Sequence, residues 1–196
     1  MAEKTIGILG GMGPEATIDL YTKITRFTGA EIDQNHLRVI VDSNPKIPNR
    51  QTAILGQGRD PSDVMAETAI ILEKAGADFI VIPCNAAQAF LSTVRRSVRI
   101  PILSIVDVTV QAVHARFPGI RRIGLMATTG TVSVGLYSTA LEKKGIGTIV
   151  PKADDQQRVM DAIVSLKAGN RSSGVKARLQ LVAEGLVARG AEAIIL

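Results

Sequence analysis

The second half of the chain repeats the first, and this repeat is the feature that most constrains the fold. The segment Gly76–Ile82 leads to Pro83-Cys84-Asn85, and Gly190–Leu196 has the same pattern of residues 114 positions later. A duplicated sequence predicts two similar lobes that carry two similar half-sites. It also places the counterpart of Cys84, the only cysteine, at the second position after Leu196.

Short apolar runs alternate with helical patterns in both halves, which is typical of parallel sheets covered by helices. The predicted strands are Thr5–Leu9, Leu37–Val41, Phe79–Ile82, Ile102–Ser104, Arg122–Met126, Thr148–Val150 and Ala193–Leu196. The predicted helices are Pro14–Phe27, Asp60–Lys74, Ala86–Arg96, Val106–Arg116, one that starts within Thr128–Thr131, Gln156–Leu166 and Ser173–Ala188. We therefore expect an α/β protein of two pseudo-symmetric doubly wound lobes with parallel sheets, residues 1–117 and residues 118–196.

The composition is that of an ordinary globular protein, with 46% hydrophobic and 21% charged residues. No apolar run approaches the roughly 20 residues that span a bilayer, and the first residues lack the basic and apolar regions of a signal peptide. A single cysteine excludes an internal disulfide framework. We expect a soluble, cytoplasmic protein that has no membrane partner.

The net charge of +5 does not by itself indicate a nucleic-acid partner. Aromatic residues make up only 3% of the chain and Trp is absent, so a base-stacking surface is not expected. Arg95, Arg96 and Arg99 fall at the end of a predicted helix, where cations are commonly solvated. The weaker alternative is that the positive charge attracts anionic substrates.

Cys84 stands between a predicted strand and a predicted helix, flanked by Pro83 and Asn85. Ligands of open parallel sheets bind beyond the carboxyl ends of the strands. The amides of a helix N-terminus stabilise a thiolate placed beside them. A free cysteine is often an inert, buried side chain, but this position favours a chemical role.

The glycine-rich loop after the first predicted strand has two interpretations. Gly11, Gly13 and Ala16 fit the dinucleotide-binding pattern G-x-G-x-x-A, and Asp42 ends the next strand. However, Asp42 lies 29 residues after Gly13, whereas the usual spacing is about 20. Pro14 also removes an N–H from the place where a pyrophosphate needs donors. A turn whose amides hold a smaller anion, such as a carboxylate, is favoured.

Three further polar segments are candidates for binding. The segment Thr128–Thr131 offers hydroxyls and amides at a predicted helix start, where N-capping and carboxylate binding are compatible roles. Arg50 closes the polar loop Asn44–Arg50, and its guanidinium either grips a carboxylate bidentately or is solvated. Lys167 is interpreted from the sequence alone as a surface residue.

Other chemistries lack their parts. His36 and His114 have no partner at ligand spacing, so no metal site is expected. The chain contains neither the phosphate-binding motif G-x-x-x-x-G-K-[ST] nor a serine nucleophile elbow.

Taken together, four motifs resemble the aspartate/glutamate racemase family, most of all its aspartate racemase branch. They are Gly10–Thr17, the loop Ser43–Arg50, Pro83–Ala87 and Ala127–Thr131, in that order along essentially the whole chain. The resemblance implies a cofactor-independent homodimer whose subunits consist of two pseudo-symmetric α/β lobes. It places the active site between the lobes, with one catalytic cysteine from each.

The two cysteines of that family explain the chemistry that the resemblance implies. Inverting a stereocentre requires removal of the α-proton on one face and delivery of a proton on the other, and two opposed thiol/thiolate groups do both. Cys84 matches the first cysteine. The second belongs to a Gly-Cys-Thr motif after the last strand of the second lobe, which is where the repeat places it, just beyond Leu196.

The resemblance also assigns the substrate-binding residues. Asn85 would orient the ammonium or α-carboxylate group, while Met12 and Asn44 would line the cleft. Three residues of the second lobe would hold a carboxylate, namely Thr128, Gly130 and Thr131. Arg50 and Lys167 match positions that grip the side-chain carboxylate of a small acidic amino acid.

The sequence departs from the family at two positions after the cysteine. The family motif Pro-Cys-Asn-Thr-Ala-His is replaced by a segment in which Ala86 and Gln88 stand for the threonine and the histidine. Our hypothesis is an amino-acid racemase acting on aspartate, with glutamate as a further candidate. The alternatives are a single-cysteine isomerase or decarboxylase of small carboxylic acids, and a catalytically silent dicarboxylate-binding protein.

Overall fold

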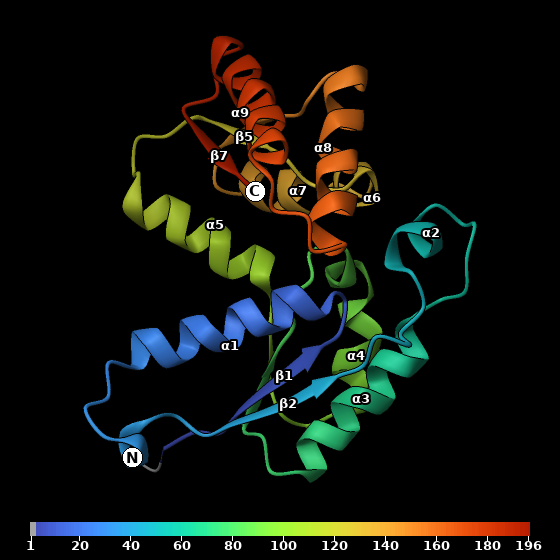
Figure 1. Cartoon of the computed structure of the whole chain (residues 1–196), viewed down its shortest axis with the longest axis vertical. Coiled ribbons are helices and arrows are strands. Elements are labelled where there is room, and N and C mark those ends of the chain that lie inside the picture. The colour runs from blue at the N-terminus through green and yellow to red at the C-terminus, as the bar shows by residue number, and fades with distance from the viewer. Residues whose placement is uncertain (1–2) are drawn as a thin grey trace. The chain divides into compact units, whose positions relative to one another are not determined.

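A computed structural model describes residues 3–196, and the chain divides into two compact units, one ending at Ile105 and the other starting at Val106. Each unit has its own parallel sheet and its own helices (Figure 1). The α/β class and the parallel sheets predicted from the sequence are therefore confirmed. The lobe boundary predicted after residue 117 lies at the other end of the connecting helix α5 (Ile105–Arg116), and it stays a prediction.

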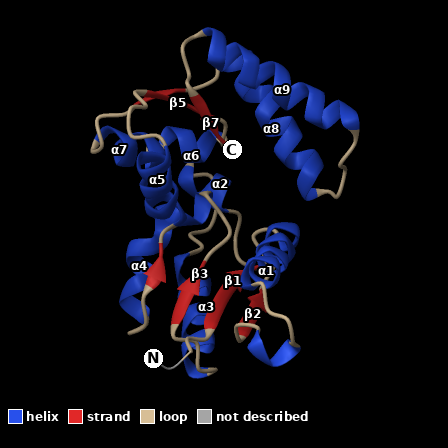
Figure 2. Cartoon of the chain, turned by 90° about the vertical axis from the view of Figure 1, so that its left-hand side faces the viewer, coloured by secondary structure: helices blue, strands red, loops and turns tan. Residues whose placement is uncertain are grey.

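The first unit contains a four-stranded sheet in which every paired strand is parallel (Figure 2). Its strands are β1 (Ile6–Gly10), β2 (Val39–Ser43), β3 (Phe79–Val81) and β4 (Ile102–Leu103), in the spatial order β2-β1-β3-β4. All five residues of β1 are buried, as expected for a central strand. The chain leaves β1 toward β2 on one side and β3 lies on the other, so the loops after β1 and β3 flank a topological switch point.

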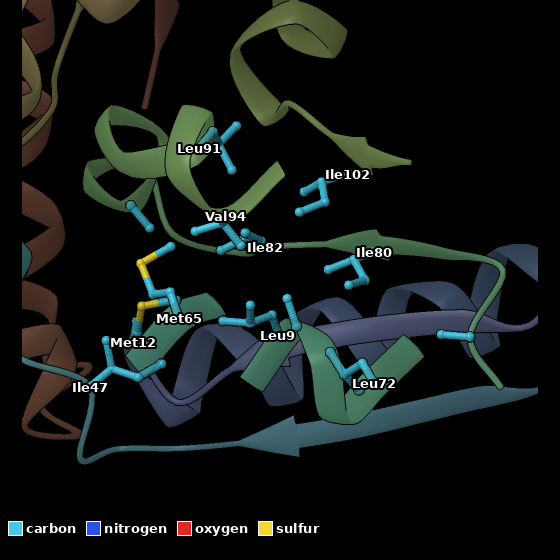
Figure 3. Close-up of a cluster of buried hydrophobic side chains, with 13 residues drawn as sticks. Leu9, Met12, Ile47, Met65, Leu72, Ile80, Ile82, Leu91, Val94 and Ile102 are labelled. Carbon is cyan, nitrogen blue, oxygen red and sulfur yellow. The ribbon is translucent and has the colours of Figure 1, made fainter. Parts of the chain in front are cut away.

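Helices cover both faces of this sheet, with α1 on one face and α3 and α4 on the other (Figure 1). The helical segments of the unit are α1 (Pro14–Thr28), η1 (Asp33–Asn35), α2 (Arg50–Ile54), α3 (Ser62–Lys74), η2 (Ala86–Phe90) and α4 (Leu91–Ser97). The core cluster includes Leu9, Met65, Leu72, Ile80 and Val94, all completely buried (Figure 3). This packing fixes the strand ends that carry the candidate residues.

The second unit repeats the topology of the first on a smaller scale. Its strands are β5 (Arg122–Leu125), β6 (Gly147–Ile149) and β7 (Ala193–Ile195), paired in parallel in the order β6-β5-β7. Its helices after α5 are α6 (Thr129–Ser133), α7 (Leu136–Glu142), α8 (Ala153–Lys167) and α9 (Ser173–Ala188). The order β6-β5-β7 corresponds to β2-β1-β3, so β7 takes the place of β3, the strand that precedes Cys84.

Several predicted segments differ in the structure. β2 is Val39–Ser43 rather than Leu37–Val41, and α8 starts at Ala153 rather than at Gln156. The expected helix Ala86–Arg96 is a 3₁₀ segment, η2, followed by α4, and the break falls at Phe90 with φ −105° and ψ 1°. The polar loop predicted through Arg50 instead ends at Asn49, whose side chain accepts hydrogen bonds from two amides of the short helix α2. Among the described residues, no helix is both long and apolar enough to span a membrane.

Candidate functional site

The loops that follow β1 and β2 touch at a point where only glycine fits. Gly11 has φ +86°, and a Cβ on it would lie 2.3 to 2.5 Å from backbone atoms of Asn44. The Asn44 side chain accepts a hydrogen bond from the Lys46 amide at 3.0 Å, which closes a local turn. The two loops therefore form one edge of the sheet.

Thr17, one turn into α1, holds the glycine loop in place. Its Oγ1 accepts from the Gly11 amide at 3.0 Å and donates to the Gly13 carbonyl at 3.2 Å. Gly10 allows this approach, because a Cβ there would come within 2.5 Å of the threonine methyl group. The sequence did not single out Thr17, since a threonine near a helix start has no signature that distinguishes this role from ordinary packing.

Met12 and Arg50 meet through the backbone of the same loop. The Met12 side chain is buried in the core cluster beside Ile47 and Met65 (Figure 3). The Arg50 guanidinium donates to the carbonyls of Ile47, Pro48 and Met12, at 3.0, 2.7 and 3.4 Å. Its Nε is buried and has no partner in the part of the chain that the structure describes.

Cys84 follows β3 at the switch point of the first sheet. Its amide donates to the Ile82 carbonyl at 2.8 Å, which closes a three-residue turn around Pro83. The side chain is half-buried and packs against the same core cluster as Met12. Asn85 is the N-cap residue of η2 and has a helical backbone. The first-unit residues predicted from the sequence thus gather at the carboxyl edge of one sheet.

Gln88 is a residue whose role sequence reasoning missed, because it registered only as a departure from a family motif. The side chain is buried, and its Nε2 donates to the carbonyls of Ile82 and Cys84. Its Oε1 accepts from the Ile105 amide at 3.2 Å. A single amide side chain therefore contacts both ends of the cysteine turn.

In the second unit, the segment after β5 forms a capped helix start. Thr128 is the N-cap of α6, and its Oγ1 accepts from the Thr131 amide at 3.3 Å. The hydroxyls of Thr128 and Thr131 lie 2.9 Å apart, and Thr131 and Gly130 are buried. The capping role considered for this segment is what the structure shows for Thr128.

α8 starts beside this segment and ends far from it. Gln156, near its start, donates to the Ala127 carbonyl at 2.9 Å and reaches Thr129 Oγ1 at 3.5 Å. Lys167 is the last residue of α8 and is exposed. At a rise of 1.5 Å per residue, the backbone of Lys167 lies roughly 16 Å along the helix from Gln156. Within the second unit, Lys167 is therefore not brought to the threonine segment.

Tyr137 and Asp60 have pKa values shifted by their surroundings, and both residues lie outside these segments. Burial raises the pKa of Tyr137 above 10.0, and a hydrogen bond with the Thr109 side chain opposes this shift. Hydrogen bonds from the Ser62 side chain and backbone lower the pKa of Asp60. Among the described residues, no cluster of three or more His, Cys, Asp or Glu side chains suits a metal ion.

The comparison with known proteins identifies the family. A family model described as Asp/Glu/Hydantoin racemase matches residues 9–196. The chain belongs to this racemase family. The aspartate racemase of Picrophilus torridus superposes with a TM-score of 0.88 at 31% identity, over 98% of this chain and 80% of that one.

Two further racemase-family relatives extend the similarity. The broad specificity amino-acid racemase RacX of Bacillus subtilis is 27% identical over 185 residues, which cover 91% of this chain and 78% of that protein. An aspartate racemase homologue from Pyrococcus horikoshii has a TM-score of 0.75 at 26% identity, over 98% of this chain and 84% of that one. The predictions of the family and of an isomerase of the amino-acid racemase type are confirmed.

Proposed function

We propose that this racemase interconverts L- and D-aspartate, with glutamate as a second substrate, and that Cys84 is one of its two acid/base groups. The observation that supports the proposal is the half-buried Cys84 thiol at the carboxyl end of β3, at the switch point of the first sheet. In open parallel sheets this is where ligands bind.

Racemisation by proton transfer needs two groups, because the α-proton leaves on one face of the carbon and a proton returns on the other. As a thiolate, Cys84 would accept the α-proton of one enantiomer, and as a thiol it would donate a proton when the other enantiomer reacts. The opposing thiol is proposed at the second position after Leu196. That position follows β7 as Cys84 follows β3. No cofactor takes part in this scheme.

Arg50 is proposed to bind the side-chain carboxylate of the substrate. A guanidinium has five N–H donors, and three of those of Arg50 are used by the carbonyls of Ile47, Pro48 and Met12. The buried Nε donor has no acceptor among the described residues. Buried donors are normally hydrogen-bonded, so a bound carboxylate would supply the acceptor that Nε lacks. Nε and Nη2 together form a fork that suits a carboxylate.

The remaining predicted residues complete the proposed site. Asn85 would contact the ammonium or α-carboxylate group, while Met12 and Asn44 shape the edge on which the substrate rests. Lys167 would add a positive charge opposite the side-chain carboxylate. In the second lobe, a carboxylate would be held by Thr128, Gly130 and Thr131. The proposed enzyme is a cytoplasmic homodimer, and the lobes of each subunit are residues 1–117 and 118–196.

The test follows the α-proton directly. The complete protein is incubated in deuterated water with each enantiomer of aspartate, glutamate and alanine, and α-deuteration and optical rotation are measured. We expect exchange and racemisation with aspartate, and Cys84→Ser should lower both by more than about 100-fold. Gln34→Ala, an exposed change in η1, is the matched control. Absence of exchange with either acidic amino acid refutes the proposal.

A second candidate would be preferred if a residue other than cysteine occupied the position paired with Cys84. A single-cysteine isomerase or decarboxylase of small carboxylic acids needs no opposing thiol. Such an enzyme would consume a small carboxylic acid without racemising aspartate. In a catalytically silent dicarboxylate-binding protein, Cys84→Ser would leave ligand affinity unchanged and no substrate would react.

A further inference from the structure

The buried side-chain amide group of Gln88 contacts the turn that contains Cys84. The side chain is only 7% exposed. Its Nε2 lies 3.3 Å from the Cys84 carbonyl oxygen and 3.5 Å from the Ile82 carbonyl oxygen. These carbonyls belong to the two ends of the three-residue turn that the Cys84 amide closes on Ile82 at 2.8 Å.

The other end of the same amide reaches a different element. Oε1 accepts at 3.2 Å from the amide of Ile105, the first residue of α5. The first amides of a helix have no acceptor within the helix, so a side-chain oxygen that satisfies one of them stabilises the helix start. Gln88 therefore ties the cysteine turn to the point where the chain leaves the first unit.

Glutamine suits this position because its amide group has two N–H donors and one carbonyl acceptor. Two carbonyls and one amide surround it, so each polar group of the side chain has a complementary partner. A histidine here would offer one donor and one acceptor, and a methionine would offer neither donors nor a strong acceptor. The backbone N–H of Gln88 also donates to the Asn85 carbonyl at 3.1 Å.

We propose that Gln88 is a positioning residue for Cys84. By holding both ends of the turn, its side chain fixes the direction in which the backbone presents the thiol, and it ties that direction to the start of α5. The expected effect of Gln88 on the rate of racemisation rests on the proposed function. The expected effect of Gln88 on the reactivity of the Cys84 thiol does not, because that reactivity is measured without a substrate.

Alkylation of Cys84 by iodoacetamide is followed by mass spectrometry of the peptide that contains it, which separates Cys84 from the second cysteine proposed after Leu196. Gln88→Met keeps the approximate volume of the side chain and removes its hydrogen bonds. We expect alkylation to become several-fold faster across the pH range, because the released turn exposes a thiol that now packs against the core. Gln88→His, which retains one donor and one acceptor, should react at an intermediate rate.

The same variants are tested for aspartate racemisation. Misplacement of a catalytic group by about 1 Å costs up to about 100-fold, so Gln88→Met should lower kcat about 10- to 100-fold. The KM should change by less than about twofold, since contacts to the bound substrate remain. Gln88→His should restore part of kcat.

A core variant separates positioning from general destabilisation. Ile6→Val lies at the amino end of β1, away from the turn, and should lower the melting temperature without changing alkylation or kcat. An alkylation rate in Gln88→Met that is unchanged or lower overturns the proposal, as does a loss of activity no larger than that of Ile6→Val. If the wild-type protein racemises nothing, the proposed function fails, and the alkylation rates still decide the role of Gln88.

Discussion

At the residue scale, Gly11 is the position where the two loops at the edge of the first sheet depend on the absence of a side chain. Its φ of +86° is costly for any other residue, and a Cβ would collide with the backbone of Asn44. We predict that Gly11→Ala lowers the free energy of unfolding by more than about 2 kcal/mol, as the sum of conformational strain and overpacking. Urea denaturation measures this difference.

Gly29→Ala is the control for the strain alone. Gly29 has φ +60° at the end of α1, but a Cβ there would meet no atom within 4 Å. The cost should be about 1 kcal/mol, and therefore clearly smaller than at Gly11. Equal losses in the two variants would show that the contact with Asn44 contributes nothing.

Candidate site residues could be predicted from the sequence only where they follow the end of a predicted strand. Cys84 follows an apolar run and precedes a helical pattern, so its place at the sheet edge could be predicted. The partners of its turn could not, because the hydrogen bonds of Gln88 depend on bringing Ile105, 17 residues away, against the turn. Thr17 was missed for the same reason, since its role depends on the path of the glycine loop.

At the scale of elements, two long helices were predicted to within one residue, whereas the short helix α2 was not predicted. Residues 14–28 and 173–188 form helices whose bounds follow the apolar pattern within one residue. α2 has only five residues, and its start depends on the side chain of Asn49, so no periodicity indicates it. Short helices are held by such local hydrogen bonds and by packing rather than by intrinsic propensity.

The link between α1 and the glycine loop gives a prediction at this scale. Thr17→Val keeps the shape of the side chain but leaves the buried Gly11 amide without its acceptor. We expect a loss of about 1–3 kcal/mol in the free energy of unfolding. Thr25→Val on the same helix is the control, since its hydroxyl is exposed and bonds only the Tyr21 carbonyl. If both changes cost the same, the glycine loop does not depend on Thr17.

At the scale of the whole molecule, Tyr137 couples stability to alkaline pH. Burial raises the pKa of its hydroxyl above 10.0, so the folded protein favours the neutral form. The resulting stabilisation is complete below pH 10.0 and is lost as the pH rises through the raised pKa of the folded state.

Tyr137→Phe tests this coupling. The change removes the hydrogen bond with Thr109 and should cost about 1 kcal/mol at neutral pH. It also removes the titration, so the melting temperatures of the two proteins should converge between about pH 8 and pH 11. Parallel melting curves over this range would contradict the prediction.

In the proposed function, the side-chain carboxylate of an acidic substrate is bound by Arg50 of the first unit and by Lys167 of the second. If Lys167 binds the side-chain carboxylate, Lys167→Met removes one charge-assisted contact worth about 1.5–3 kcal/mol. The kcat/KM for aspartate should then fall at least about tenfold, while that for alanine stays unchanged. The change should not affect the melting temperature, because Lys167 is exposed at the end of α8. Lys144→Met, another exposed lysine of the second unit, is the control. An equal fall for aspartate and alanine would show that Lys167 does not bind that carboxylate.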